Sequence, residues 1–578
     1  MKYLKYIFAG LLTTSLTGCL NFEPEAEMND ATVWTTASNY QLFANQFYSY
    51  TRDFQSTTNY QCGVSDGPHS DLRSDLVAES SLNQYSAGTN SVPEKDGNYT
   101  SLYTHIYYCN LLLDRAESFA DKAAIAVPVA EAKFFRAYSY FELLQIYGDA
   151  IIVTKPLDIS SPELYVSQNN RSEVADLIVS DLKEAAEALP VNAVEKGRLT
   201  KDAALAMLSR VALYEGTWQK FHSGGANADS NNERVNSLLQ TAKAAAAEVM
   251  EGGRYKLFYN EQLGKESYRY MFILEDTKCN PAGLTTSDNT EYILARRHRL
   301  EDGIGLNITK AYLANAVFPT SKLANLYLCQ DGLPVAKSKK FAGYATAVSE
   351  FQNRDNRMAT TLIPNETVVW DNTVNNSRKT WDDDDLSRGK KISVRSNSGY
   401  QTHKWAVERY VADRMESMEF PVIRYAEVLL NYAEATYELG GNISDTDLDK
   451  SLNLVRRRIN PDMTKLSNAL VSANALSMRE EIRRERTVEL LFEGFRIDDL
   501  KRWATAPVEM PMDLTGVLFK GTWFESNWSG QTRELTSDGH ILLYGNRQWA
   551  DRLYLYPLPS EQLQLNPQLK QNPGWEKE

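Results

Sequence analysis

EAKFFRAYSYFELLQIYGDAIIVTKPL, residues 131–157, is the most informative stretch of this 578-residue chain. Its apolar side chains cover nearly the whole circumference of a helix: Phe134, Phe135, Ala137, Tyr138, Tyr140, Phe141, Leu143, Leu144 and Tyr147. A helix of this kind has to pack between neighbours. Gly148 predicts a left-handed end to it, and the β-branched run 151–153 predicts extended chain as far as Pro156.

Further helical segments follow in pairs along the chain. We expect them at residues 99–119, 171–189, 200–212, 235–250, 422–439, 448–459 and 478–500. Thr200 is placed to cap one of them, and the alanines that follow it allow a partner helix to approach closely. Helices that bury their inner faces against the next unit are typical of tetratricopeptide-like repeats, although the period here is irregular and any one pair could be a generic helical hairpin.

Two regions interrupt this pattern. Residues 54–97 and 257–399 are rich in polar residues and glycine, with a short strand expected at 292–294. Long irregular insertions in a compact domain are uncommon unless they have a function, so we expect ligand contacts there. The predicted fold class is mostly α, a tetratricopeptide-like helical-pair scaffold with long irregular loop insertions and a few short strands.

The composition is that of a globular protein, with 43% apolar and 24% charged residues. The net charge of -13 argues against nucleic acid as a partner, because phosphates require clustered Lys and Arg. It also weighs, less strongly, against sulfated or uronate-rich polymers as ligands. A local basic patch could override that second inference.

The first residues predict export. Lys2 and Lys5 precede an apolar run at 6–12, and Leu-Thr-Gly-Cys at 16–19 matches the cleavage site of bacterial lipoproteins. We therefore expect a signal peptide at 1–18, lipidation of Cys19 and a flexible acidic tether at 19–35; an ordinary cleaved signal is the alternative. No later run reaches the roughly 18 apolar residues that suggest a membrane-spanning helix.

Two further motifs accompany the helix at 131–147. They are FPVIRYAEVLLNYAEATYELG at 420–440 and RRERTVELLFEGFRIDDLKRW at 483–503, with shorter matches at 319–334, 351–358 and 556–575. In this order they resemble the SusD/RagB family, the glycan-binding surface lipoproteins of Bacteroidetes nutrient-uptake systems. The resemblance implies an N-terminal SusD-like region at 36–260 and a C-terminal RagB/SusD region at 261–578, packed as one unit. One departure from the family pattern is the turn at 459–463.

The resemblance also implies a function without catalysis. Members of the family capture oligosaccharide or polysaccharide and deliver it to a SusC-like TonB-dependent outer-membrane transporter. The protein would then be lipid-anchored in the outer membrane and face the cell exterior, and the acidic stretch after Cys19 resembles the family's export signal.

Sugar binding requires flat apolar faces together with planar hydrogen-bonding groups. By the family's pattern, Arg and Asn of the first insertion and aromatics just before residue 319 line the groove. The resemblance therefore points to Arg73, Asn83, Tyr85, Tyr312 and Phe318. Trp370 and Trp381 are further candidates as exposed platforms.

Several other motifs match catalytic or metal-binding patterns only in part. Residues 63–67 match the nucleophile elbow G-x-S-x-G but lack the strand and helix that it needs. Residues 445–449 begin like a calcium loop but lack its glycine and its closing glutamate, which favours a helix N-terminus. No cofactor is expected, although the carboxylate run Asp382, Asp383, Asp384 and Asp385 is either a solvated turn or a calcium site. Disulfides and buried thiols remain alternatives for Cys62, Cys109, Cys279 and Cys329.

Most charges of the 483–503 motif are expected to be structural. Its Arg and Glu residues are spaced to support a helix through i to i+4 pairs. Four others could form buried pairs that hold the helix to the core: Arg496, Asp498, Asp499 and Arg502. Three rival functions stay open: a secreted glycoside hydrolase, a calcium-dependent adhesin, and a surface binder of peptides or another nutrient.

Overall fold

The structure is a computed structural model that describes residues 33–54, 67–222, 232–299, 305–313, 317–364, 396–407, 414–528 and 532–576. Within these residues helices dominate, and the six strands are short and pair into three two-stranded antiparallel sheets. The predicted fold class is confirmed.

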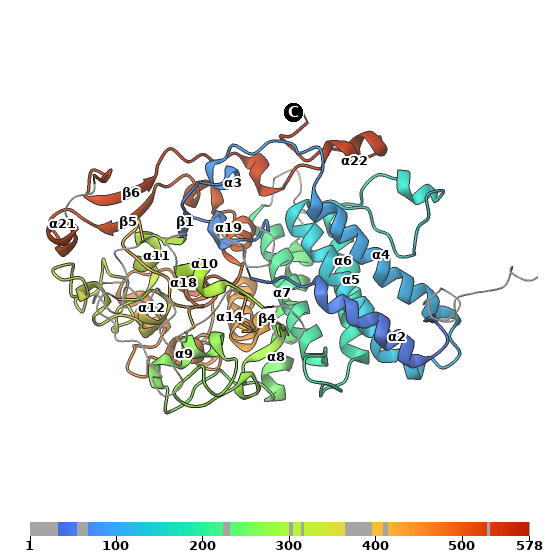
Figure 1. The fold of residues 1–578 in the computed structure, drawn as a ribbon, viewed down its shortest axis with the longest axis horizontal. Helices are drawn as coiled ribbons and strands as arrows, with labels where there is room; N and C mark the ends of the chain where they lie inside the picture. Colours follow the sequence, from blue (N-terminus) through green and yellow to red (C-terminus); the bar gives the residue numbers. More distant parts are fainter. Residues whose placement is uncertain are drawn as a thin grey trace, which may run out of the picture.

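Five long helices form the first part of the scaffold (Figure 1). They are α4 (Gly97–Ser118), α5 (Ala126–Ile146), α6 (Arg171–Ala188), α7 (Lys201–Phe221) and α8 (Asn232–Gly252). Each packs against the next one along the chain. The predicted stacking of helical pairs is therefore confirmed for this region.

Local sequence explains where these helices begin and end. The side chain of Thr200 accepts a hydrogen bond from the backbone N–H of Ala203 and caps α7, as predicted. Gly148 has φ +79°, the left-handed conformation expected after α5. All residues of helix α5 from 130 to 146 except Lys133 are buried, which is why apolar residues cover nearly its whole circumference.

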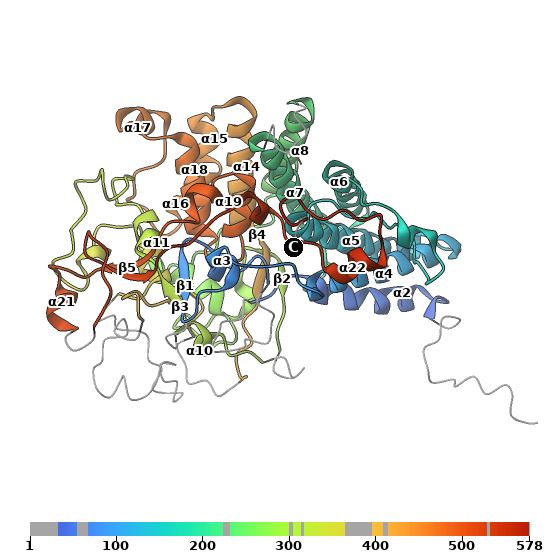
Figure 2. The same cartoon turned by 90° about the horizontal axis from the view of Figure 1, so that it is seen from above.

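The second part of the scaffold continues the stack. Helix α14 (Tyr425–Gly440) packs against α8 and α7, and α18 (Met478–Glu489) packs against α14 (Figure 2). The helices α15 (Asp445–Asp449) and α16 (Leu452–Arg457) lie in the same part of the fold. Ser444 caps α15, so the stretch that resembled a calcium loop is a helix N-terminus, as predicted.

Three predicted helices differ from the structure. The expected helix 448–459 is divided between the end of α15 and α16, with Lys450 and Ser451 between them. The expected helix 422–439 begins only at Tyr425, because Phe420–Arg424 forms strand β4. The expected helix 478–500 is broken into α18 and α19 (Arg496–Arg502), with Phe492 at φ +63° and Gly494 at φ +79° between them. Two left-handed residues so close together end the helical hydrogen-bond ladder.

The three sheets join distant parts of the chain. Strand β2 (Tyr292–Arg296), predicted at 292–294, pairs with β4. Strand β1 (Val77–Glu79) pairs with β3 (Val317–Pro319), and β5 (Leu514–Leu518) pairs with β6 (His540–Tyr544).

Shorter helices complete the described fold. The α-helices are α2 (Ala37–Ala44), α3 (Gln84–Ala87), α9 (Ser267–Tyr270), α10 (Ile308–Leu313), α11 (Ser321–Leu326), α12 (Asn356–Thr361), α17 (Asn468–Ala473), α20 (Ala506–Glu509), α21 (Trp523–Asn527) and α22 (Ser560–Leu565). The 3-10 turns are η1 (Asn45–Tyr50), η2 (Asp71–Arg73), η3 (Ala123–Ile125), η4 (Pro162–Tyr165), η5 (Gly264–Glu266), η6 (Met271–Ile273), η7 (Thr286–Asp288), η8 (Ser349–Phe351) and η11 (Asp551–Tyr554).

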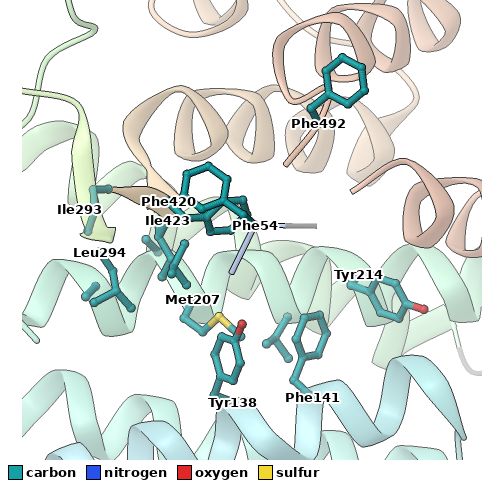
Figure 3. Packing of buried hydrophobic residues seen from close by; sticks show 14 of the residues in the cluster. Phe54, Tyr138, Phe141, Met207, Tyr214, Ile293, Leu294, Phe420, Ile423 and Phe492 are labelled. Atoms are coloured by element: carbon teal, nitrogen blue, oxygen red, sulfur yellow. The ribbon is translucent and has the colours of Figure 1, made fainter. Parts of the chain in front are cut away.

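The largest apolar core spans both parts of the chain (Figure 3). Phe54 lies with its ring centroid 5.2 Å from that of Phe420 and 5.0 Å from that of Trp405. Met207 of α7 and Tyr138 of α5 belong to the same core. The division of the chain at residue 260 stays a prediction.

The last described residues return to the first helices. The backbone N–H of Tyr556 donates to the carbonyl of Ile146 at 2.7 Å, and Asn572 Nδ2 donates to the carbonyl of Tyr147 at 2.9 Å. Helix α22 lies beside α4 in both views (Figures 1 and 2). The end of α5 is therefore closed by a segment about 400 residues further along the chain.

Two further predictions concern cysteines and membrane segments. Cys109, Cys279 and Cys329 are free and buried, which matches the alternative of buried thiols; Cys62 lies outside the described residues. Among the helices that the structure describes, none has the length and apolarity needed to cross a bilayer.

Candidate functional site

The two irregular insertions meet in the structure. In the antiparallel pair of β1 and β3, Ala78 lies opposite Phe318. The contact continues where Thr320 donates to the carbonyl of Leu76 through both its backbone N–H (3.0 Å) and its hydroxyl (2.9 Å). The segments predicted to supply ligand contacts are therefore adjacent, although about 240 residues separate them in sequence.

Arg73 and Tyr85 come together on a third residue. Nη1 of Arg73 donates to the hydroxyl of Tyr556 at 2.6 Å. The rings of Tyr85 and Tyr556 are stacked, with centroids 5.4 Å apart and planes 4° from parallel. Lys501 Nζ lies 5.3 Å from the Tyr85 ring centroid, and burial lowers the pKa of this lysine to about 8. These contacts tie the first insertion to the C-terminal segment.

The other three predicted residues have structural contacts. Asn83 Oδ1 accepts a hydrogen bond from the backbone N–H of Ser86 at 2.7 Å and so caps α3. Tyr312 and Phe318 are only 1% and 2% exposed. Tyr85 is likewise buried, so these three rings present no open face to a ligand in this structure. The ligand-binding prediction for Arg73, Asn83, Tyr85, Tyr312 and Phe318 stays untested.

Several predicted residues lie outside the described part of the chain: Cys19, Trp370, Trp381, and Asp382 to Asp385. Their assignments stay predictions. Among the described residues, no group of three or more His, Cys, Asp or Glu side chains is arranged to hold a metal ion.

The 483–503 motif builds a buried ion-pair network. Arg424 donates to Glu489 and to Glu493, each at 2.7 Å. Arg357 donates to Glu489 at 2.8 Å. Burial raises the pKa of Glu489, but the charges of the arginines around it outweigh burial and hold that pKa well below its usual range. Glu489 and Glu493 therefore pair across elements, whereas Arg483 and Arg484 pair along α18 with Glu480 and Glu481, at 3.5 and 3.3 Å, as the expected helix support requires.

The predicted buried pairs of the same motif are confirmed. Arg496 pairs with Asp75 at 2.7 Å, and Asp499 pairs with Arg486 at 2.8 Å. Arg502 pairs with Glu434 at 2.6 Å. All of these residues join α18 or α19 to neighbouring elements, which supports a structural role for the motif.

A groove that the sequence analysis did not identify runs along the outer side of α4. It has a volume of about 420 Å³ and lies between α4, the segment 151–164 and α22. Its lining contains four tyrosines of α4, together with hydroxyl and amide side chains: Tyr99, Tyr103, Tyr107, Tyr108, Thr100, Thr104, Gln562 and Asn566.

Hydrogen bonds hold the walls of this tyrosine groove together. The hydroxyl of Tyr103 accepts from the backbone N–H of Ile151 at 2.9 Å and fixes the segment after α5 against α4. Asn566 Nδ2 donates to the carbonyl of Val166 at 2.8 Å and fixes α22 to the opposite wall. Between these walls Tyr107 and Tyr108 remain 40% and 36% exposed, with ring centroids 5.5 Å apart.

The groove has the chemistry of a binding site. Aromatic faces suit the C–H surfaces of a sugar, and hydroxyl and amide groups suit its hydroxyls. Glycoside hydrolysis requires two carboxyl groups about 5–10 Å apart. Glu163 is the one carboxylate among the lining residues, and its hydrogen bond with Lys155 lowers its pKa. The spacing of Tyr99, Tyr103 and Tyr107 at i and i+4 was the sequence signal for this face.

The scaffold of stacked helical pairs with irregular insertions defines a tetratricopeptide-like class of protein. Comparison with family models then identifies the family. The model described as "SusD family" matches residues 284–575, and one described as "Starch-binding associating with outer membrane" matches residues 25–213. The chain belongs to the SusD/RagB family.

Individual relatives are distant. SusD-like protein P38 of Formosa agariphila is 22% identical over 522 residues, which cover 87% of this chain and 90% of the relative. SusD-like protein P25 of the same organism is 29% identical over 128 residues, so the match spans 21% of this chain and about a quarter (24%) of that protein's length.

Solved structures share the fold. A SusD-like carbohydrate binding protein from Bacteroides fragilis superposes with a TM-score of 0.71 at 21% identity and covers 93% of this chain and 100% of the other. A SusD homologue from Bacteroides thetaiotaomicron superposes with a TM-score of 0.57 at 20% identity and covers 95% of this chain and 99% of the other. These likenesses extend across both parts of the scaffold.

Proposed function

We propose that this protein is a cell-surface glycan-binding lipoprotein that captures oligosaccharide or polysaccharide without cleaving it. In this proposal Cys19 carries the lipid that anchors the protein in the outer membrane, and a SusC-like TonB-dependent transporter receives the glycan. Membership of the SusD/RagB family supports the proposal. So does the description of the second matching family model, which names starch binding and the outer membrane.

The tyrosine groove is the observation that carries the proposal. Tyr107 and Tyr108 are partly exposed in a groove that is also lined by Thr100 and Thr104. A sugar ring stacked there would gain apolar contact on one side and hydrogen bonds at its edge.

The proposal is tested by affinity electrophoresis of the wild type against a panel of neutral and acidic polysaccharides, followed by the double variant Tyr107→Ala/Tyr108→Ala. Losing two aromatic contacts should weaken binding by about tenfold or more, since about 1.4 kcal/mol corresponds to a factor of ten. Tyr259→Ala is the matched control, because Tyr259 is 53% exposed and does not line the groove. Equal retardation of the double variant and the control would remove the groove from the proposal.

The same preparation separates the rival functions. Release of reducing ends during incubation would identify a hydrolase, and loss of binding with chelator would support a calcium-dependent adhesin. A glycan array without signal, together with peptide binding, would favour a peptide binder, for which the apolar lining of the groove is also suited. Cys19→Ser should move the protein from the membrane fraction to the soluble fraction if the lipid is its anchor.

A further inference from the structure

A second hollow lies on another part of the molecule and is lined mainly by charged side chains, whereas the tyrosine groove is mainly aromatic. It has a volume of about 570 Å³ and is bordered by η1, the loop 195–198 and the end of β2 with the residues that follow it. Five of its lining side chains are cationic and one is acidic: Lys196, Arg198, Arg296, Arg297, Arg299 and Glu195. This concentration of positive charge occurs in a chain whose net charge is -13.

Arg198 forms the floor of this basic hollow. Its Nε and Nη2 donate to the two carboxylate oxygens of Glu131 at 3.0 and 2.6 Å, and its Nη1 donates to Asn45 at 2.7 Å. Glu131 is fully buried beneath it. All three guanidinium nitrogens of Arg198 are therefore engaged, and this residue shapes the site.

Arg296 and Arg297 form one wall and are held from behind. Nη1 of Arg296 donates to the carbonyl of Tyr48 at 2.7 Å. Arg297 donates through Nε to Glu419 at 3.1 Å and through Nη1 to the carbonyl of Lys196 at 3.1 Å. A guanidinium has five N–H donors, so these contacts orient each side chain and leave donors for a ligand. The side chains are 26% and 33% exposed.

Gly197 allows this arrangement. It has φ +92°, and a Cβ added to it would lie 2.9 Å from Cδ of Arg297. The glycine thus lets the loop 195–198 turn under the arginine without a side chain in between. Arg299, at the rim, is exposed and forms no ion pair with any described residue.

The charges are arranged by depth. Glu131, Asp53 and Glu419 neutralise three of the cations, and their side chains are 0%, 10% and 14% exposed. With Glu195 this leaves five positive and four negative groups, but the three paired carboxylates are the less exposed partners, whereas Arg296 and Arg297 are 26% and 33% exposed and Arg299 is exposed. An anion entering it meets positive charge first.

We infer that the basic hollow binds the anionic groups of an acidic saccharide, either uronate carboxylates or sulfate esters. Guanidinium groups recognise both through paired, charge-assisted hydrogen bonds. The inference rests on the proposed glycan-binding function and narrows its ligand class. The net charge of the whole chain weighed against sulfated or uronate-rich ligands, and this local basic site is the exception to that expectation.

The test uses two matched pairs of probes with the full-length protein. The first pair is tetragalacturonate and its fully methyl-esterified form, which keeps the sugar rings and removes the charge. The second is a sulfated carrageenan tetrasaccharide and its desulfated form. Calorimetry should show that the wild-type protein binds at least one charged probe about tenfold or more tightly than the neutral counterpart of that probe. The affinity for the charged probe should fall as the salt concentration rises.

Arg299→Gln is the informative variant because its side chain is exposed and supports no described contact, so folding should be unaffected. It should weaken binding of the charged probe several-fold and leave the melting temperature unchanged. Arg297→Lys keeps the charge, removes the fork geometry and should also weaken binding. Lys465→Gln, an exposed lysine outside the hollow, is the matched control and should bind like the wild type.

Every outcome decides between the alternatives. Preference for the carboxylated or the sulfated probe identifies the source of the anion. Equal binding of charged and neutral probes, or an Arg299→Gln variant with wild-type affinity, overturns the inference. If neutral glycans bind through the tyrosine groove while both acidic probes fail, the inference is wrong and the proposed function stands. If no saccharide binds at all, both are wrong.

Discussion

Removing the charge of Glu434 should destabilise the fold strongly at neutral pH and weakly in acid. The carboxylate accepts hydrogen bonds from Arg502 at 2.6 and 2.8 Å and from Trp503 Nε1 at 2.7 Å. Burial raises the pKa of Glu434, but the charge of Arg502 and these hydrogen bonds outweigh burial and lower it from 4.5 to about 2.

The pKa sets the magnitude. A fall of about 2.5 in pKa corresponds to about 3 kcal/mol of stability. Because the folded pKa lies below the unfolded one, this contribution is complete above pH 4.5 and is lost as the pH falls toward 2. At pH 3 about 1 kcal/mol should remain.

Glu434→Gln should therefore lower the free energy of unfolding by about 3 kcal/mol at pH 7, and the difference from wild type should shrink toward about 1 kcal/mol at pH 3. Urea unfolding at both pH values measures this. Lys465→Gln is the control, because it breaks an exposed pair with Asp449 and should cost less than about 1 kcal/mol. A cost for Glu434→Gln that equals the control, or that does not change with pH, would refute the reasoning.

Two further stability predictions follow from buried positions. Burial raises the pKa of Glu416 from 4.5 to about 7, so the wild type should lose stability as the pH rises through that window. The melting temperature of Glu416→Gln should equal that of the wild type near pH 4 and exceed it at pH 8. The same difference in melting temperature at both pH values would contradict this. Gly148 and Gly343 both have positive φ, but only at Gly148 would an added Cβ meet a neighbour, Leu555 Cδ1 at 2.8 Å. Gly343→Ala should lower the free energy of unfolding by about 1–2 kcal/mol, the strain of a left-handed alanine, and Gly148→Ala should lower it by more. Thermal unfolding measures both, and equal losses would show that Leu555 moves aside freely.

Local patterns predicted the helices well and the strands poorly. The circumference of α5 and the cap of α7 depend on residues within a few positions of each other, so the sequence contains the whole signal. By contrast, β1 and β3 are three residues long and pair across about 240 residues, which no local pattern contains. The break between α18 and α19 was missed because Phe492, a residue rarely left-handed, has φ +63°.

The candidate site was harder to predict for a related reason. Tyr85, Tyr312 and Phe318 were predicted from the family pattern, and the structure buries all three rings; their role in ligand binding stays a prediction. The tyrosine groove depends on α22, which comes from the far end of the chain and forms one wall beside α4. The spacing of the tyrosines on α4 can be read from the sequence. The position of α22, which turns that helix face into a groove, cannot.

The return of residues 556–572 to the end of α5 has a consequence for biogenesis. A polypeptide chain is synthesised from its N-terminus, so the end of α5 stays partly uncovered until residues 556–572 have been made and can pack against it. Completion of this part of the core should therefore be a late step of folding, and chains truncated shortly before residue 556 should depend most on chaperones.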